Sequence, residues 1–187
     1  MGPDVEPEVS RAKVPHPDGI AIEPRSGDLR LVRRWFSGKI VLAAFFCVFW
    51  DGFLISWYTR PELPLVAKLF PLLHLAVGVV MTYWVFAGFL NSTVIDVGMG
   101  QLTIRHRPVP WPGNRHLMRA DLTQLFSEQV TNSSRYTSYR LSAVRRDGRK
   151  VKLVSGLPEA DQALFLEQQI EAYLGIRDQR VGGELPR

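Results

Sequence analysis

Two long apolar runs dominate the pattern of hydrophobic and polar positions along the chain. The first extends from Ile40 to Tyr58, the second extends from Leu65 to Leu90, and the polar turn TRPELP separates them. A hydrocarbon core of ~30 Å requires about 20 helical residues that each rise ~1.5 Å, so either run is long enough to cross a bilayer. We therefore predict a transmembrane helical hairpin over residues 39–90. The alternative is a buried helical hairpin in a soluble protein, but basic residues flank both runs on one side, which favours the membrane.

The charges at the ends of the two runs predict the orientation of the hairpin. The turn carries only Arg60, which Glu62 balances. The basic residues outside the turn lie shortly before the first run or after the second, at Arg30, Arg33, Arg34, Lys39, Arg105 and Arg107. Because Lys and Arg near the ends of spans stay on the cytoplasmic side, both termini should be cytoplasmic. The first run lacks a small-residue cleavage site, so we do not expect it to be removed as a signal peptide.

Period-two alternation on both sides of the apolar runs predicts β-strands. Near the N-terminus, Ile20 and Ile22 alternate with other residues, and residues 19–36 are predicted to form a β-hairpin. After Leu90, alternating segments predict five or six further strands. The dipeptide Asp147-Gly148 is the strongest hairpin signal among them.

An amphipathic helix is predicted to follow the strands. Pro158 suits a first helical position, and Gly175 suits a C-terminal stop. The apolar residues between them repeat every three to four positions, at Ala163, Leu166, Ile170 and Leu174. This order predicts an α+β domain over residues 91–176, in which a C-terminal helix caps a curved antiparallel sheet.

The two ends of the chain lack a hydrophobic period. Residues 1–18 are rich in Pro, Glu and Asp and cannot bury enough apolar surface to offset their ordering entropy, so they are predicted to be a disordered tail. Residues 177–187 are predicted to be a solvated tail.

The order of these elements resembles that of bacterial membrane proteins with a pleckstrin-homology-like (PH-like) domain. More locally, the segments WFSGK, FWDGFLISWY, FPLLHLAVG, PVPWPGN and QALFLEQQIEAYLGI resemble a family of uncharacterised bacterial two-helix membrane proteins. The resemblances imply a PH-like cytoplasmic domain over residues 91–176 and a place in the bacterial inner membrane, and they imply no activity. Such a domain has more strands than we count after Leu90, so we expect the hairpin of residues 19–36 to join the C-terminal sheet.

Few catalytic or metal-binding patterns are available to this chain. The only cysteine, Cys47, lies in the first apolar run, which excludes a disulfide framework and a Cys-based zinc site. GxSxG, GxGxxG and phosphate-loop motifs are absent. The histidines show no HxxxH or HExxH spacing; they are His16, His74, His106 and His116. We therefore expect no enzymatic activity and no bound metal.

Three ionisable residues interrupt the apolar runs, and they are the candidate polar contacts inside the membrane: Asp51, His74 and Lys68. Counted from the turn, Asp51 and His74 lie at similar depths, whereas Lys68 is shallow enough to reach the headgroups. A carboxylate at mid-bilayer is costly unless it is protonated, paired or turned into a protein interior. Asp51 could thus bond His74 or Lys68 within the hairpin, or both Asp51 and His74 could face a partner subunit. In a third interpretation they transfer protons, or His74 ligates a haem or chlorophyll-type pigment; no other cofactor is expected.

A basic cluster surrounds the predicted turn at Asp147-Gly148, and it comprises Arg145, Arg146, Arg149 and Lys150. Near an anionic leaflet each basic residue gains about 1 kcal/mol, which would make the cluster a headgroup contact. We favour the alternative of a solvated strand edge whose charges deter aggregation. Nucleic acid is not expected as a partner, because the cluster is short and lacks interleaved aromatic residues.

The loop PVPWPGN places Trp111 between two prolines, which hold it in an extended conformation. Trp111 is either an exposed anchor for a partner or the membrane interface, or a cover over one end of the sheet.

These patterns favour a non-enzymatic accessory, scaffold or assembly subunit of an inner-membrane protein complex. Its partners would be membrane lipids and either other membrane subunits or further copies of itself, because a two-helix hairpin buries little of its own surface. The alternative is a membrane protein that binds lipid headgroups through the basic cluster or a pigment through His74.

Overall fold

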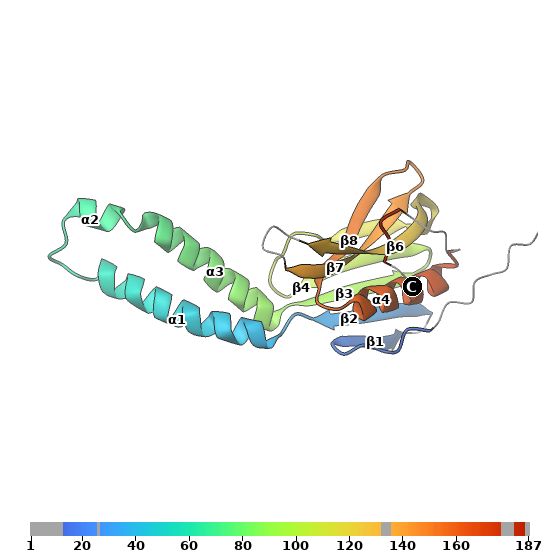
Figure 1. Cartoon of the computed structure of the whole chain (residues 1–187), viewed down its shortest axis with the longest axis horizontal. Helices are drawn as coiled ribbons and strands as arrows, with labels where there is room; N and C mark the ends of the chain where they lie inside the picture. Colours follow the sequence, from blue (N-terminus) through green and yellow to red (C-terminus); the bar gives the residue numbers. More distant parts are fainter. Residues whose placement is uncertain (1–12, 26, 132–135, 177–181, 186–187) are drawn as a thin grey trace, which may run out of the picture. The chain divides into compact units, whose positions relative to one another are not determined.

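The computed structural model describes residues 13–25, 27–131, 136–176 and 182–185 (Figure 1). The chain divides into two compact units. The helical unit comprises residues 32–94 and 104–114, and the sheet unit comprises the described residues of 1–31, 95–103 and 115–187. Residues 132–135, whose sequence Asn-Ser-Ser-Arg predicts a polar bend, lie outside the described residues.

The helical unit consists mainly of two long helices that lie side by side (Figure 1). They are α1, Gly38–Tyr58, and α3, Leu72–Leu90, and the short helix α2, Leu65–Leu69, precedes α3. The second apolar run is therefore interrupted between Leu69 and Leu72. The interruption falls at Pro71, because proline lacks the N–H that would continue the helical ladder and its ring clashes with the preceding turn. Both apolar runs form helices long and apolar enough to cross a membrane.

Small residues allow α1 and α3 to approach each other closely. A small apolar core forms where buried Ile40 and Cys47 of α1 meet Val85 of α3. Gly88 faces Ile40 so closely that a Cβ atom at position 88 would lie 2.6 Å from Ile40 Cδ1. Gly52, in contrast, has no such neighbour within 4 Å. Gly88 is thus required by the helix contact, whereas Gly52 is not.

Eight strands form two sheets in the described part of the chain. Strands β1 to β5 form one sheet in chain order, and β6 to β8 form a second, antiparallel sheet in chain order. The strands of the first sheet are β1, Ile20–Arg25; β2, Asp28–Arg34; β3, Ser92–Gly98; β4, Gln101–Arg107; and β5, Arg115–Met118. Those of the second are β6, Leu122–Thr131; β7, Thr137–Arg145; and β8, Lys150–Leu157, with a single 3₁₀ turn at Arg119–Asp121 before β6.

The two N-terminal strands belong to the same sheet as the first strands after α3. β2 neighbours β3 in the strand order, and Arg30 Nε of β2 lies 2.6 Å from Asp96 Oδ1 of β3. The carboxylate of Asp96 accepts a hydrogen bond from Arg30 and raises the pKa of the guanidinium above its ordinary value. Segments separated by the whole helical hairpin in sequence therefore pair in one sheet.

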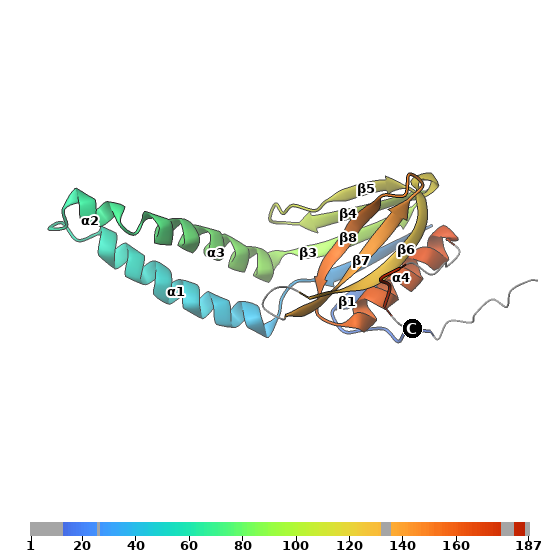
Figure 2. The same cartoon turned by 45° about the horizontal axis from the view of Figure 1, so that its top comes forward.

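The C-terminal helix α4, Ala160–Leu174, packs against β6, β7 and β8 (Figure 2). Its residues Ala163, Leu166 and Ile170 are completely buried, as are Phe126 and Leu141 of the sheet. The helix ends at Gly175, whose φ of +59° lies in the left-handed region that favours glycine. The structure thus confirms two long apolar helices and an antiparallel, sheet-rich domain with a C-terminal helix.

The predicted N-terminal tail is wrong for residues 13–18, which lie against α4. Val14 N donates to Gln168 Oε1 at 3.1 Å, and Gln162 Nε2 donates to the carbonyl of Asp18 at 2.9 Å. The His16 ring meets Phe165 edge-on, with 5.0 Å between the ring centroids. These contacts with α4 offset the conformational entropy that residues 13–18 lose when they become ordered. The composition of the segment does not reveal them. Residues 1–12 lie outside the described residues.

The predicted C-terminal tail is also wrong for residues 182–185. Leu185 N donates to the carbonyl of Ser127 in β6 at 2.8 Å. Lys150 Nζ donates to the carbonyl of Gly182 at 3.3 Å. A segment without a hydrophobic period is held here by backbone hydrogen bonds to a strand and a lysine, which no local pattern reveals. Residues 177–181 and 186–187 lie outside the described residues.

Replacing Gly88 should weaken the contact between α1 and α3. In Gly88→Val, the new side chain must displace Ile40, and overpacking of this kind costs about 1 to 3 kcal/mol. We expect a lower thermal unfolding midpoint for the full-length protein in mild detergent. Gly52→Val is the matched control, since no side chain opposes that position. Equal midpoints for the two variants would contradict the helix contact.

Candidate functional site

Asp51 forms a hydrogen bond across the helix pair. Thr82 Oγ1 of α3 donates to Asp51 Oδ2 of α1 at 2.6 Å. One turn earlier on α3, Gly78 leaves the space that the carboxylate occupies, because a Cβ atom there would lie 2.9 Å from Asp51 Oδ1. A carboxylate inside an apolar helix pair is therefore bonded and accommodated by residues of the second helix.

Asp51 bonds within the hairpin, but its partner is Thr82 rather than the candidates His74 and Lys68. The expectation counted depth along a single helix from Leu65, but α3 begins only at Leu72. Asp51 lies seven residues before the end of α1. The same distance from the start of α3 leads to Val79, between Gly78 and Thr82, whereas His74 lies in the first turn of α3.

The structure places His74 among aromatic rings instead. Its ring stacks with Trp50 at 5.7 Å and with Phe70 at 6.4 Å between centroids. Trp50 Nε1 also donates to the carbonyl of His74 at 3.2 Å. Lys68 lies in the last turn of α2, before the break at Pro71. The three candidate polar residues therefore do not form one cluster.

Asp51 and Thr82 line an open groove of about 740 Å³ along the helix pair, which we call the Asp51 groove. Its other walls are mainly apolar and include Ile55, Val79 and Phe86. The hydroxyl of Tyr58 also lies on this groove and is buried, and no hydrogen-bond partner for it occurs among the residues that the structure describes. The groove thus presents polar groups within an apolar wall.

Trp111 is half-buried against aromatic residues of the helical unit. Its ring is parallel to that of Tyr83 on α3, with 6.2 Å between centroids, and meets Trp35 edge-on at 5.3 Å. The Tyr83 hydroxyl donates to the carbonyl of Pro110. The loop that carries Trp111 therefore folds back onto α3.

Asn91, at the end of α3, holds this loop in place. Its Nδ2 donates to the carbonyl of Val109 at 2.9 Å, and its Oδ1 accepts from Val109 N at 2.7 Å. The side chain is almost completely buried. In the sequence, the only signal for this role of Asn91 is a polar residue directly after an apolar helix.

Beside the loop lies a second open cleft of about 630 Å³, which we call the Trp111 cleft. The α3 residues on its walls include Val80, Met81 and Trp84, and the loop contributes Pro110 and Trp111. These side chains are predominantly apolar. Both the cleft and its walls belong to the helical unit.

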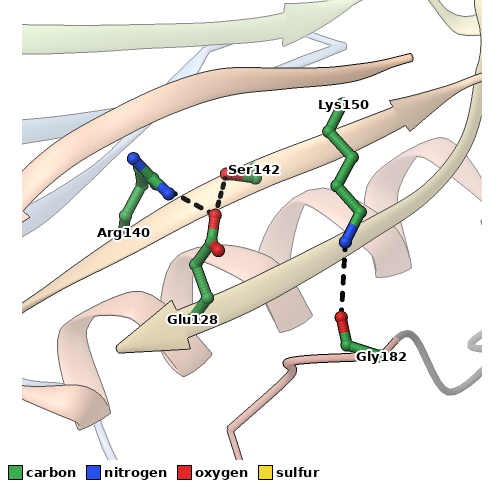
Figure 3. A network of polar contacts seen from close by, with 5 residues as sticks. All are labelled: Glu128, Arg140, Ser142, Lys150 and Gly182. Carbon is green, nitrogen blue, oxygen red and sulfur yellow. Dashed lines mark hydrogen bonds and ion pairs between the residues drawn. The ribbon is translucent and has the colours of Figure 1, made fainter. Parts of the chain in front are cut away.

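Acidic residues accompany the basic cluster at the β7–β8 turn. Arg145 lies 3.7 Å from a carboxylate oxygen of Asp121 and 3.9 Å from one of Asp147. Arg149 also lies 3.9 Å from Asp147, although its own side chain is largely exposed. Lys150 lies 4.8 Å from the centroid of the Phe126 ring and contacts Gly182 (Figure 3), whereas Arg146 is exposed. These contacts favour the interpretation as a solvated edge over a headgroup contact.

Glu128 of β6 accepts two hydrogen bonds from the neighbouring strand β7 (Figure 3). Arg140 Nε donates at 2.9 Å and Ser142 Oγ at 2.8 Å. Partial burial raises the pKa of Glu128, but these two hydrogen bonds and the charge of Arg140 outweigh it, so the pKa lies below its usual range. The charged form of Glu128 therefore stabilises the folded sheet.

Among the described residues, no group of three or more His, Cys, Asp or Glu side chains could hold a metal ion. Comparison of the chain with models of known protein families and with curated proteins finds no match.

Glu128→Gln should weaken the pairing of β6 with β7 at neutral pH. Hydrogen bonds to a charged group of this partial exposure contribute about 1 kcal/mol to folding stability. The glutamine amide of the variant retains only part of this contribution. The contribution is present above the unfolded-state pKa of about 4.3 and is lost as the pH falls through the lower folded-state pKa. Urea unfolding followed by circular dichroism should thus show a lower stability for the variant than for wild type at neutral pH. In acid the two stabilities should converge. A stability difference between wild type and variant that does not change with pH would contradict the stabilising role of the charged form of Glu128.

Proposed function

We propose that this protein is a two-span protein of the bacterial inner membrane and a non-enzymatic accessory subunit of a membrane protein complex. The observation that carries the proposal is the Asp51 groove, in which a carboxylate and a buried hydroxyl lie within an otherwise apolar helix pair.

The exposure of the two long helices supports the membrane location. Only 17% of the apolar window of α1 and 11% of that of α2 and α3 is buried inside the protein. A helix that is apolar on all sides and exposed on most of them is suited to lipid or to another apolar helix. The excess of Lys and Arg near Gly38 and Leu90 supports cytoplasmic termini. The two sheets and the packing of α4 on β6, β7 and β8 support a PH-like cytoplasmic domain.

The chemistry of the Asp51 groove supports a helix of another membrane protein as the partner. In lipid, a polar group gains most when a second protein group bonds it, because lipid tails offer none. Thr82 supplies one hydrogen bond to Asp51. A helix bearing a hydroxyl, amide or basic group would bond the carboxylate and Tyr58 while its apolar residues cover Ile55 and Val79.

Site-specific photo-crosslinking tests the partner. A benzophenone amino acid at Ile55 lies in the Asp51 groove, whereas one at Phe53 lies outside its walls at similar exposure, 65% against 61% for the native side chains. We expect irradiated cells to yield a discrete heterologous protein adduct from position 55 and not from position 53. Adding Asp51→Leu should reduce this adduct about fivefold, the effect of one interhelical hydrogen bond.

Two results of this experiment would overturn the accessory role. Equal adducts from positions 55 and 53 would show that the groove selects no partner. An adduct with the mass of two copies of this chain would show self-association in place of a partner subunit.

The orientation is tested by cysteine labelling in intact cells. In a Cys47→Ser background, Glu62→Cys places a thiol in the turn between α1 and α2, and Gln129→Cys places one on the exposed surface of β6. An impermeant maleimide should label position 62 in intact cells and position 129 only after lysis. The reverse pattern, or labelling of both positions in intact cells, would contradict cytoplasmic termini.

A further inference from the structure

The Trp111 cleft is built from the middle of α3 and the loop that follows β4. Val80 and Trp84 of α3 lie six to ten residues before the helix ends at Leu90, which corresponds to about 9 to 15 Å along the axis. In the proposed membrane location, this stretch lies at the depth of the acyl chains of the cytoplasmic leaflet. The volume of about 630 Å³ lies within the range of about 300 to 1,000 Å³ found for small-molecule sites.

The walls of the cleft are held in place by contacts outside the cleft. Asn91 holds Val109 by two hydrogen bonds, at 2.9 and 2.7 Å. Behind Trp111, Trp35 Nε1 donates to Thr93 Oγ1 at 2.7 Å, and the same hydroxyl lies 3.0 Å from Nδ1 of His106. A preformed apolar wall binds an acyl chain with a smaller entropy cost than a wall that must first be ordered.

The charge of the surrounding chain favours an anionic occupant. Asp51 of α1, which accepts a hydrogen bond from Thr82, lies on the Asp51 groove. Segments 32–45, 79–94 and 104–114 of the helical unit themselves contain no Asp or Glu. They contain five basic residues: Arg33, Arg34, Lys39, Arg105 and Arg107. Of these, Arg34, Lys39, Arg105 and Arg107 are exposed. At a membrane surface, basic residues in the chain segments that contribute to an apolar cleft match a negative headgroup above an acyl chain.

We propose that the Trp111 cleft binds one anionic phospholipid, with an acyl chain against Val80, Trp84 and Trp111 and its phosphate at Arg105 and Arg107. The proposal rests on the proposed membrane location but not on the accessory role, because the cleft and the Asp51 groove are different surfaces. Tyr83 separates them: it lines both.

Quenching of tryptophan fluorescence by brominated lipids tests the site. The full-length protein is reconstituted in phosphatidylcholine bilayers, and phosphatidylglycerol with brominated acyl chains is added in small amounts. Because Trp84 and Trp111 line the cleft, we expect quenching that saturates at a low mole fraction of this lipid. Brominated phosphatidylcholine at the same mole fraction should quench less.

Matched variants locate the site and separate it from the partner groove. Val80→Phe fills the Trp111 cleft and should abolish the saturating component, whereas Val79→Phe, one residue away on the Asp51 groove, should leave it intact. Arg105→Gln combined with Arg107→Gln should raise the half-saturating mole fraction of brominated phosphatidylglycerol about tenfold. Each basic residue near anionic lipid contributes to the free energy of binding.

The photo-adduct from position 55 provides the second readout. Val80→Phe should keep this adduct, which also shows that the variant is folded, and Val79→Phe should lose it. Equal quenching by the two brominated lipids in wild type would overturn the proposal, as would saturable quenching that persists in Val80→Phe. Neither result depends on whether a partner protein binds the Asp51 groove.

Discussion

The pairing of α1 with α3 brings together two points of the chain that are more than fifty residues apart. The helices have similar lengths, 21 and 19 residues, so the chain leaves α3 close to where it entered α1. The backbone N–H of Trp35 then donates to the carbonyl of Asn91 at 3.2 Å, directly before β3 begins. β2 and β3, which flank the helical hairpin in the sequence, are neighbours in one sheet.

Polar residues set the registry of this helix pair, while small residues allow its closeness. The bond from Thr82 to Asp51 selects one longitudinal offset between α1 and α3, because the buried apolar contacts of Ile40, Cys47 and Val85 are less directional. Gly78 provides the space for Asp51. The same carboxylate then lines an open groove, so a residue that stabilises the hairpin is also available to a further helix.

The helical unit includes a loop that the sequence analysis assigned to the C-terminal domain. Residues 104–114 belong with the helices because Asn91, Tyr83 and Trp35 all contact the loop or Trp111. This grouping brings the rings of Trp35 and Tyr83 into contact with that of Trp111. The interpretation of residues 91–176 as a single domain is therefore too simple, since contacts rather than chain order define the two units.

Patterns of composition and periodicity were sufficient to predict two apolar helices, the hairpin turn at Asp147-Gly148 and the apolar face of α4. These features follow from local rules: apolar length, turn geometry that requires glycine at φ of +78°, and a repeat of three to four residues. Because of the break at Pro71, α3 begins only at Leu72, and Thr82 was therefore missed as the partner of Asp51. The contacts of residues 13–18, the position of Trp111 and the two open surfaces were decided only by the tertiary structure. Each of these features depends on contacts with a segment that is distant in the sequence. The packing of the whole chain determines which segments meet, and no local pattern reveals it.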